Sequence, residues 1–236
     1  MAKIGFAVPI LPGKEDLATI HSIEEIRRRL PEYEESRHRA GVTVERVYLQ
    51  SNPDDSKLFV IYVEAAGETA GVAGTFAASG SDFDRWFLDV NQEITGIDFG
   101  QPAPGGGPEH VASWEEPGGS RGPGLAFAVP LLPGKAEALR AWAREAFESR
   151  RRELAESRLA LGQTREEVFL NSSPAGDVCV AYLEGKDPIQ ANREFAASAA
   201  PYDRWFKDGL KTLFPPFVDF DQPVPANETV WDWARD

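Results

Sequence analysis

The sequence predicts an α+β protein made of two tandem copies of one βαββαβ unit, and the first observation behind this is an internal repeat. The segment Phe6–Lys14 returns as Phe127–Lys135 with a single Ile-to-Leu change. Further pieces return 119 to 121 residues later: Phe76–Ser79 as Phe195–Ser198, Asp84–Phe87 as Asp203–Phe206, and Asp98–Phe99 as Asp219–Phe220. The second observation is that strand-like and helix-like apolar spacings follow one another in the same order in both copies. Two copies are too few for a solenoid, so we expect an intrachain pseudo-dimer.

Each copy is predicted to open with a strand, Ile4–Ile10 or Leu125–Leu131, which a Pro-Gly pair ends. A long helix should follow, because apolar residues then recur every three or four positions. These positions are Ile20, Ile23, Ile26, Leu30 and Tyr33 in the first copy, and Leu139, Trp142, Ala146, Phe147 and Leu154 in the second. Pro31 has no proline counterpart in the second copy, so we expect a kink or break near Leu30 in the first copy.

Two strands joined as a hairpin come next, at Thr43–Ser51 and Lys57–Glu64 in the first copy. A second helix is expected through Phe76 or Phe195. It should be interrupted near Gly80 or Pro201 and resume as the Asp-Arg-Trp-Phe turn. A short last strand should close each copy, at residues 97–99 and 218–220.

The order βαββαβ is the ferredoxin-like arrangement, whose helices cover only one face of the sheet. The other face must also be covered, and the second copy of the same sheet can do this. The element order, the unit length and the late Asp-Arg-Trp-Phe turn resemble the dimeric α/β-barrel superfamily, in which two ferredoxin-like units close into one barrel. The resemblance covers nearly the whole chain. It implies two fused units forming an intramolecular pseudo-dimeric barrel, as in antibiotic-biosynthesis monooxygenase-like, EthD-like and stress-responsive barrel proteins.

The domain limits follow from the repeat. We expect a first unit with a C-terminal arm at 1–116, a linker at 117–123, and a second unit with its own arm at 124–236. The arms are proposed because Glu109, Val111 and Trp114 match Glu228, Val230 and Trp233. Each arm should pack its tryptophan onto the barrel.

The composition limits the possible partners. Asp and Glu number 38 against 25 Lys and Arg, for a net charge of −13, which disfavours nucleic acid and anionic membrane surfaces. The single cysteine excludes an internal disulfide, and we see neither a signal peptide nor a membrane-spanning segment. We therefore expect a cytoplasmic protein that is a monomer, as a pseudo-dimer, or a loose homodimer.

Several motifs point to little chemistry. The Gly118–Gly122 sequence matches a nucleophile-elbow pattern but lies in the linker, without the strand and helix that this pattern needs. The three histidines, His21, His38 and His110, have no metal-ligand spacing, and the second helix carries no histidine where haem-binding relatives keep theirs. Cys179 lies in an apolar run and is interpreted as a small buried hydrophobe. We expect no metal, haem or other cofactor.

The Asp-Arg-Trp-Phe turn has two interpretations. A planar ligand could stack on Trp86 or Trp205, with Arg85 or Arg204 holding an oxyanion. Alternatively, the turn is an aromatic plug whose aspartate caps a helical turn. The structural interpretation is favoured because both copies carry the turn.

Strand alternation gives the candidate catalytic residues, Tyr62 and Glu64 with Tyr182 and Glu184. In the third strand of the first copy, Tyr62 and Glu64 share one face, whereas Phe59 and Ile61 share the other face and should meet the helices. A partly desolvated glutamate in the barrel interior could act as a base near neutral pH. The alternative is a structural ion pair with Arg37 or Arg158.

Two principal functions remain open. The first is binding of a small apolar or aromatic ligand in the barrel cleft without metal or organic cofactor. The second, which the resemblance implies, is a cofactor-independent monooxygenase or isomerase acting on an aromatic or polyketide-like substrate. A third possibility is a structural barrel that mediates protein association.

Overall fold

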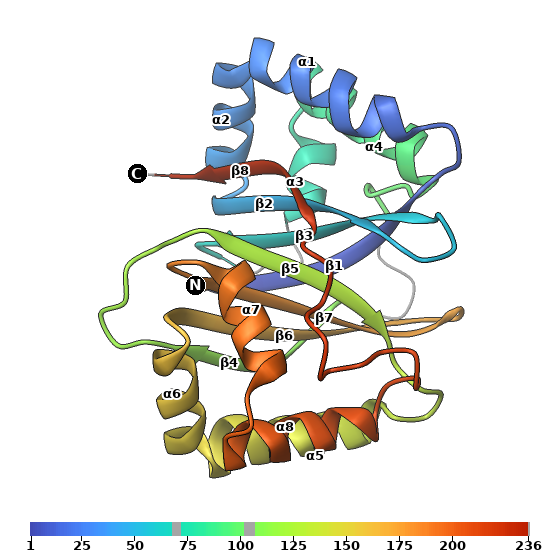
Figure 1. The fold of residues 1–236 in the computed structure, drawn as a ribbon. Coiled ribbons are helices and arrows are strands. Elements are labelled where there is room, and N and C mark those ends of the chain that lie inside the picture. Colours follow the sequence, from blue (N-terminus) through green and yellow to red (C-terminus); the bar gives the residue numbers. More distant parts are fainter. Residues whose placement is uncertain (68–71, 102–106, 236) are drawn as a thin grey trace. The chain divides into compact units, whose positions relative to one another are not determined.

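The structure is a computed structural model that describes residues 1–67, 72–101 and 107–235. Its chain divides into two compact units, which we describe separately. The first unit comprises residues 1–107 together with 228–236, and the second comprises residues 108–227. The assignment to an α+β fold with two antiparallel four-stranded sheets is confirmed (Figure 1).

The first unit has the sheet order β1-β3-β2-β8, with every pairing antiparallel. Its strands are β1 (Ala2–Ile10), β2 (Val42–Ser51), β3 (Lys57–Ala65) and β8 (Glu228–Ala234). Its helices are α1 (Ser22–Arg28), α2 (Leu30–Arg39), α3 (Val72–Ala78) and α4 (Asp82–Thr95), with a π-helical turn at Leu17–His21. The predicted hairpin in this unit is confirmed as β2 and β3.

The second unit repeats this arrangement with the sheet order β4-β6-β7-β5. Its strands are β4 (Glu109–Glu115), β5 (Gly124–Pro130), β6 (Gln163–Ser173) and β7 (Gly176–Gly185). Its helices are α5 (Ala136–Arg144), α6 (Arg151–Ala160), α7 (Pro188–Ala197) and α8 (Pro201–Lys211), with a π-helical turn at Glu145–Ser149. Asp187 caps α7 as its sequence suggests, because its Oδ1 accepts a hydrogen bond from Gln190 N at 2.9 Å.

The arms are exchanged between the units. Strand β4, which follows the first copy, pairs with β6 of the second unit. Strand β8, at the end of the second copy, pairs with β2 of the first unit. The arm tryptophans do pack onto helices, since Trp233 lies 5.6 Å from Tyr33 and Trp114 is buried in the core of the second unit. The division of the chain into a first unit at 1–116, a linker at 117–123 and a second unit at 124–236 stays a prediction.

The predicted last strands are wrong. Residues 97–99 and 218–220 form no strand. The fourth strand of each sheet is instead an exchanged arm, β8 beside β2 in the first sheet and β4 beside β6 in the second. Prolines at 215, 216, 223 and 225 explain this for the second copy, because they have no N–H for a strand ladder. Phe99 and Phe220 pack against the cores instead, 6.4 Å from Phe6 and 5.4 Å from Phe214 between ring centres.

The long helix is broken in both copies. The break expected from Pro31 is found at Arg29, between α1 and α2. The second copy has no proline there and yet breaks at Arg150, with nearly the same backbone angles. The break therefore does not require a proline.

The two faces of each sheet divide as alternation predicts. Phe59 on β3 packs into a core with Ala18 and with Val90 and Ile94 of α4, so the apolar face meets the helices. Tyr62 and Glu64 alternate with Phe59 and Ile61 and therefore lie on the other face. Within the described residues, no helix is long and apolar enough to span a membrane.

Candidate functional site

The tyrosine and glutamate candidates meet in pairs. Tyr62 Oη donates a hydrogen bond to Glu64 Oε1 at 2.8 Å, and Tyr182 Oη donates to Glu184 Oε2 at 2.6 Å. All four side chains are buried, with no more than 1% exposed. In the second unit Glu184 also accepts a hydrogen bond from Gly122 N at 3.0 Å. A catalytic role for these residues stays a prediction.

The arginines that were expected to pair with these glutamates have other partners. Arg37 Nε donates to Glu45 Oε2 at 2.6 Å, and Arg158 forms the matching ion pair with Glu166. The reason is the strand pleat: Glu45 lies opposite Val63 and Glu166 lies opposite Leu183, which places both on the helix-facing side of their sheets. Glu64 and Glu184 face the other side.

In the second unit the Asp-Arg-Trp-Phe turn has a buried aspartate and a buried phenylalanine. In the second unit Asp203 is 4% exposed and accepts hydrogen bonds from the hydroxyls of Ser157 and Ser198. Phe206 is 3% exposed, and the guanidinium of Arg158 lies 4.6 Å from its ring centre. These two side chains tie the turn to α6 and to the core.

The arginine and tryptophan of the turn lie nearer to the surface. Arg204 is exposed, and its Nε donates to Ala199 O at 2.7 Å. Trp205 is half-buried beneath the guanidinium of Arg150, 3.9 Å from its ring centre. In the first unit Arg85 is 67% exposed and lies 3.2 Å from Asp82. Ligand binding by Arg85, Trp86, Arg204 and Trp205 stays a prediction.

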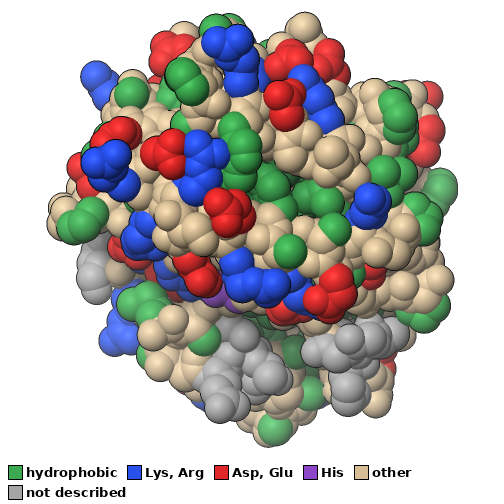
Figure 2. Space-filling model, turned by 90° about the horizontal axis from the view of Figure 1, so that it is seen from below, with side chains coloured by type: hydrophobic (Ala, Val, Ile, Leu, Met, Phe, Trp, Pro, Cys, Tyr) green, Lys and Arg blue, Asp and Glu red, His purple; other side chains and the backbone are tan. Residues whose placement is uncertain are grey.

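The second unit contains a cavity of about 80 Å³ between the helix-facing side of its sheet and its helices, which we call the second-unit cavity. Its floor comes from the strands, its walls come from α5 to α8, and one side comes from the segment after α8. The lining residues are Phe127, Val129, Leu139, Trp142, Arg158, Gln163, Glu166, Val168, Cys179, Ala181, Asn192, Phe195, Phe206, Leu210, Phe214, Phe220, Gln222 and Val224. Seen from the side of α5 and α8, apolar side chains also reach the surface between charged ones (Figure 2).

Two polar groups of the cavity neutralise one another. Arg158 and Glu166 form a buried ion pair, 3% and 8% exposed, and the guanidinium also stacks over Phe195 at 4.8 Å. Because the pair is compensated, the cavity offers neither a free cation for an anionic ligand nor a free carboxylate for a cationic one.

A third polar group in the cavity lacks a partner. Gln163 is 3% exposed, and its Oε1 has no hydrogen-bond partner among the described residues. The indole Nε1 of Trp142 is likewise buried and unpartnered within the described chain. Buried polar atoms are nearly always hydrogen-bonded in native proteins, so an unpartnered acceptor beside a cavity indicates a place for a ligand or water.

Cys179 lies on the floor of the cavity, where its buried thiol is only weakly nucleophilic. Burial, and then the nearby charge of Glu166, raise the pKa of its thiol to about 12. The thiol is therefore protonated at neutral pH. This agrees with the interpretation of Cys179 as a small buried side chain.

The repeat shows how the cavity arises. Phe59 and Cys179 occupy the same register position, since each lies opposite the valine of the Phe-Ala-Val sequence on the neighbouring strand, Val8 or Val129. Ile61 and Ala181 are equivalent in the same way, opposite Phe6 and Phe127. Two large side chains of the first unit are thus replaced by two small ones on the floor of the second.

A polar replacement accompanies these two. Gln163 begins β6 where Val42 begins β2, and each lies opposite the end of the third strand of its copy. The second copy has therefore gained both empty volume and an unpartnered acceptor. Sequence reasoning missed this site because it compared polar positions; a comparison of side-chain size along the two third strands would have found it.

No group of His, Cys, Asp and Glu that could hold a metal is found in the part of the chain that the structure describes. His110 on β4 instead contacts the buried Glu167, 2.8 Å from its Nε2, and stacks on Phe169 at 4.8 Å. This contact helps to hold the exchanged strand β4 on β6.

Comparison with known proteins supports the fold. No protein-family model matches the chain, and no curated protein matches its sequence. A crystal structure of an anthrone oxidase-like protein aligns over 98% of this chain and 92% of its own, with a TM-score of 0.52 and 13% identity. A "putative monooxygenase" of Fusobacterium nucleatum aligns over 99% of this chain and 94% of its own, with a TM-score of 0.50 and 9% identity. The chain therefore shares its fold with these two solved structures.

Proposed function

We propose that the chain binds a small, uncharged, ring-containing molecule in the second-unit cavity. The observation that carries this proposal is the cavity itself, which has an apolar and aromatic lining and one unpartnered acceptor, Gln163 Oε1. Binding sites for small molecules have this composition: mostly hydrophobic walls with a few polar groups that set orientation.

The charge of the ligand follows from the polar groups. Arg158 is already neutralised by Glu166, so an anion would have to be buried without a countercharge. A neutral ligand with a hydroxyl or N–H group can donate to Gln163 Oε1 at no such cost. The net charge of −13 also disfavours anionic ligands.

The size of the cavity limits how the ligand enters. An engineered cavity of about 150 Å³ is large enough for benzene, and a water molecule needs about 10 to 15 Å³ by the same kind of measure. The second-unit cavity, at about 80 Å³, therefore has room for several waters but not for a ring. Binding of a ring requires one wall to move outward.

Three matched compounds test the proposal on the full chain by isothermal titration calorimetry. p-Cresol carries a ring and a hydroxyl donor, toluene lacks the donor, and benzoate carries a negative charge. We expect p-cresol to bind more tightly than toluene, and benzoate not to bind, because an unpaired buried charge is costly.

Two variants locate the site. Ala181→Ile restores the side chain of the equivalent Ile61 and should abolish p-cresol binding by filling the cavity. Gln163→Val restores the residue of Val42 and should weaken p-cresol about fivefold, the worth of one neutral hydrogen bond, while leaving toluene unchanged. Ala160→Ile at an exposed position is the control. Retained p-cresol binding in Ala181→Ile would show that the ligand lies elsewhere.

We also propose that the two sheets close into one intramolecular barrel, so that the chain is a monomer. The burial of Tyr62, Glu64, Tyr182 and Glu184 on the faces opposite the helices supports this, as does the likeness to the solved structures above. Light scattering should give a mass near 25.9 kDa for the full chain. A stable dimer would mean that each chain needs a second copy.

A second candidate function is the oxidation of an aromatic substrate by dioxygen, which the names of the two structural neighbours favour. Anthrone, the compound in one of those names, is the substrate to test, with oxygen consumption as the measurement. Oxygen consumption faster than in buffer alone, and lost in the Ala181→Ile variant, would support an enzyme acting in this cavity. Equal rates with and without protein would leave binding as the proposed function.

A further inference from the structure

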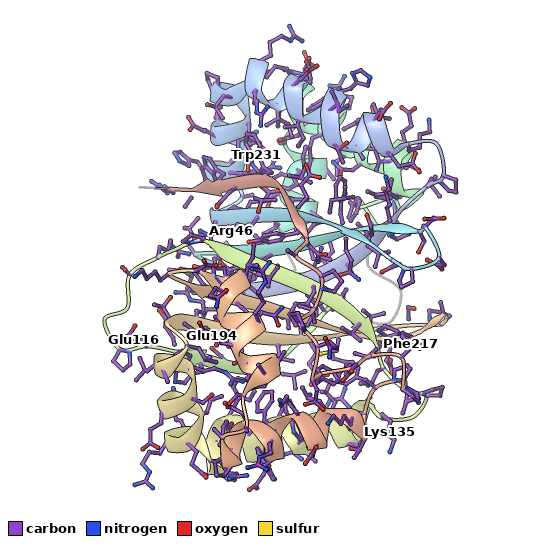
Figure 3. All side chains as sticks on the ribbon, viewed as in Figure 1. Arg46, Glu116, Lys135, Glu194, Phe217 and Trp231 are labelled. Atoms are coloured by element: carbon purple, nitrogen blue, oxygen red, sulfur yellow. The ribbon has the colours of Figure 1, made fainter. Side chains whose placement is uncertain are left out.

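The segment that follows α8, residues 215–227, forms one side of the second-unit cavity. Phe220, Gln222 and Val224 line it from this segment, and Gln222 is exposed. The segment has no helix or strand, and four of its residues are prolines, which donate no backbone hydrogen bond. Phe217, which lies on the same segment, is 75% exposed (Figure 3).

Few interactions hold this segment, which makes it the wall that opens at the least cost. Only Val218, Phe220, Val224 and Asn227 among its residues 216–227 are even partly buried. The helices and strands that form the rest of the cavity are held by continuous backbone hydrogen bonds and by the core.

Asp221 fastens the middle of the segment to α8. Its Oδ2 lies 2.6 Å from Lys211 Nζ, and its Oδ1 lies 3.0 Å from Lys207 Nζ. Lys207 is 3% exposed, and its ammonium group also donates to Ala196 O at 2.7 Å and to Ser198 O at 3.0 Å. When Asp221 leaves, Lys207 keeps these two carbonyls at the end of α7, so the contact between α7 and α8 can survive an opening of the segment.

A second fastening lies three residues later. Asn192 Nδ2 on α7 donates to Val224 O at 3.1 Å. The segment is thus held from α8 at Asp221 and from α7 at Val224. Its last residue, Asn227, also donates through Nδ2 to Ala126 O of β5 at 2.7 Å.

The first copy lacks these fastenings at the equivalent positions. Gly100 corresponds to Asp221, Leu88 to Lys207, Gln92 to Lys211, and Ala73 to Asn192. The charged fastening therefore occurs in the copy whose sheet floor has been emptied by Cys179 and Ala181. The contacts that hold the segment thus occur in the copy that contains the cavity.

From these observations we propose that residues 215–227 are a lid on the second-unit cavity, and that Asp221, held between Lys207 and Lys211, is its latch. The proposal rests on the proposed binding function, because a ring needs more than the closed volume. The ligand enters when Asp221 releases the two lysines, and the lid returns to its closed contacts when the ligand leaves.

The single cysteine of the chain gives a direct measurement of opening. Cys179 lines the cavity together with the three lid residues, so a thiol reagent that enters past the lid reaches it. Methyl methanethiosulfonate is small enough to react there and leaves only a methylthio group. Because burial is the main cause of the raised thiol pKa of Cys179, the thiol should react at pH 8 mainly when opening of the lid admits water and reagent. The reaction rate of the full-length protein therefore reports the population of the open lid.

Asp221→Asn keeps the shape of the side chain and removes its charge. Because a hydrogen bond to a charged group contributes about 1.5 to 3 kcal/mol, we expect Cys179 to react about tenfold faster or more. Lys211→Gln removes one of the two lysines and should give a smaller increase. Asp208→Asn is the matched control, since Asp208 also contacts Lys211, at 3.4 Å, but lies on α8 outside the lid.

The urea dependence separates lid opening from global unfolding. Lid opening exposes little surface, so the labelling rate should vary weakly with urea below the unfolding transition. The lid is contradicted if Asp221→Asn and Lys211→Gln label at the parent rate, or if their rates rise only in proportion to the loss of global stability. The labelling uses no ring ligand, so a lid that opens in a protein that fails to bind p-cresol would contradict the proposed function alone.

Discussion

The two aromatic residues of the second Asp-Arg-Trp-Phe turn should differ sharply in what they contribute to stability. Phe206 is 3% exposed and contacts the rings of Trp142 at 4.5 Å and Phe195 at 5.6 Å. Trp205 is half-buried and covered by the guanidinium of Arg150, 3.9 Å from its ring. The prediction concerns the variants Phe206→Ala and Trp205→Ala.

The magnitudes follow from burial. Truncating a fully buried phenylalanine costs about 3 to 5 kcal/mol, which is the range expected for Phe206→Ala. For Trp205→Ala, a cation–π contact contributes about 1 kcal/mol and the half-buried ring about as much again, so we expect about 2 kcal/mol. The expectation from sequence alone, in which Trp205 is a core residue, would have given the larger value.

Urea unfolding at 25 °C measures both free energies, and p-cresol titration gives the second readout. Phe206 lines the cavity and Trp205 does not, so Phe206→Ala should alter binding whereas Trp205→Ala should leave it intact. Trp86→Ala makes the same change in the first unit, where Arg29 lies 5.7 Å from the ring. A Trp205→Ala variant that unfolds like the parent but no longer binds p-cresol would refute the reasoning and favour a ligand stacked on this tryptophan.

Three further variants follow from the same structure. Ala181→Ile adds three carbons to an empty space, and at about 0.8 kcal/mol per buried methylene it should stabilise the chain by up to about 2 kcal/mol, as urea unfolding would show; a loss of stability would mean that the space is too small. Gly209→Ala places a Cβ 2.4 Å from Trp142 Nε1 and should cost about 1 to 3 kcal/mol by overpacking, measured in the same way. Arg140 holds the pKa of the Glu109 carboxyl below its usual 4.5, so the stability that this ionised group contributes is present above pH 4.5 and is lost as pH falls through the lower folded-state pKa. Arg140→Gln should therefore make the acid side of the stability profile shallower, and an unchanged profile would contradict the assignment.

Most of the fold could be predicted because the same sequence motifs and the same apolar spacings occur in both copies. The Phe6–Lys14 sequence and its copy show the duplication, and alternation in the third strand correctly divides its two faces. The exchange of the arms could not be predicted in this way. Trp114 and Trp233 are equivalent, and so are the sheet edges that receive them, so the sequence gives no preference between the edge of the arm's own copy and that of the other copy.

The site was harder to predict than the fold, for a different reason. Polar residues that alternate on an apolar strand attract attention, which led to Tyr62 and Glu64 with their copies. The second-unit cavity is instead marked by missing volume at Cys179 and Ala181, which is visible only when one copy is compared with the other. Gln163 could not be distinguished from a surface glutamine, because its burial depends on how the helices pack over β6.

A contact within the second unit holds the C-terminal end of the proposed lid, because Asn227 Nδ2 donates to Ala126 O of β5 at 2.7 Å. The lid runs directly into β8, whose Trp231 Nε1 donates to Tyr33 Oη at 2.8 Å and whose Asp232 Oδ1 accepts from Arg46 Nε at 2.8 Å (Figure 3). At its other end the lid leaves α8 just beyond Lys211. Opening therefore needs the release of Asp221 and of Val224 O and the movement of Phe220 away from Phe214, while the Asn227 contact can remain. In our proposal, the second copy binds the ligand in the space left by Cys179 and Ala181, and the segment that precedes β8 controls access to that space.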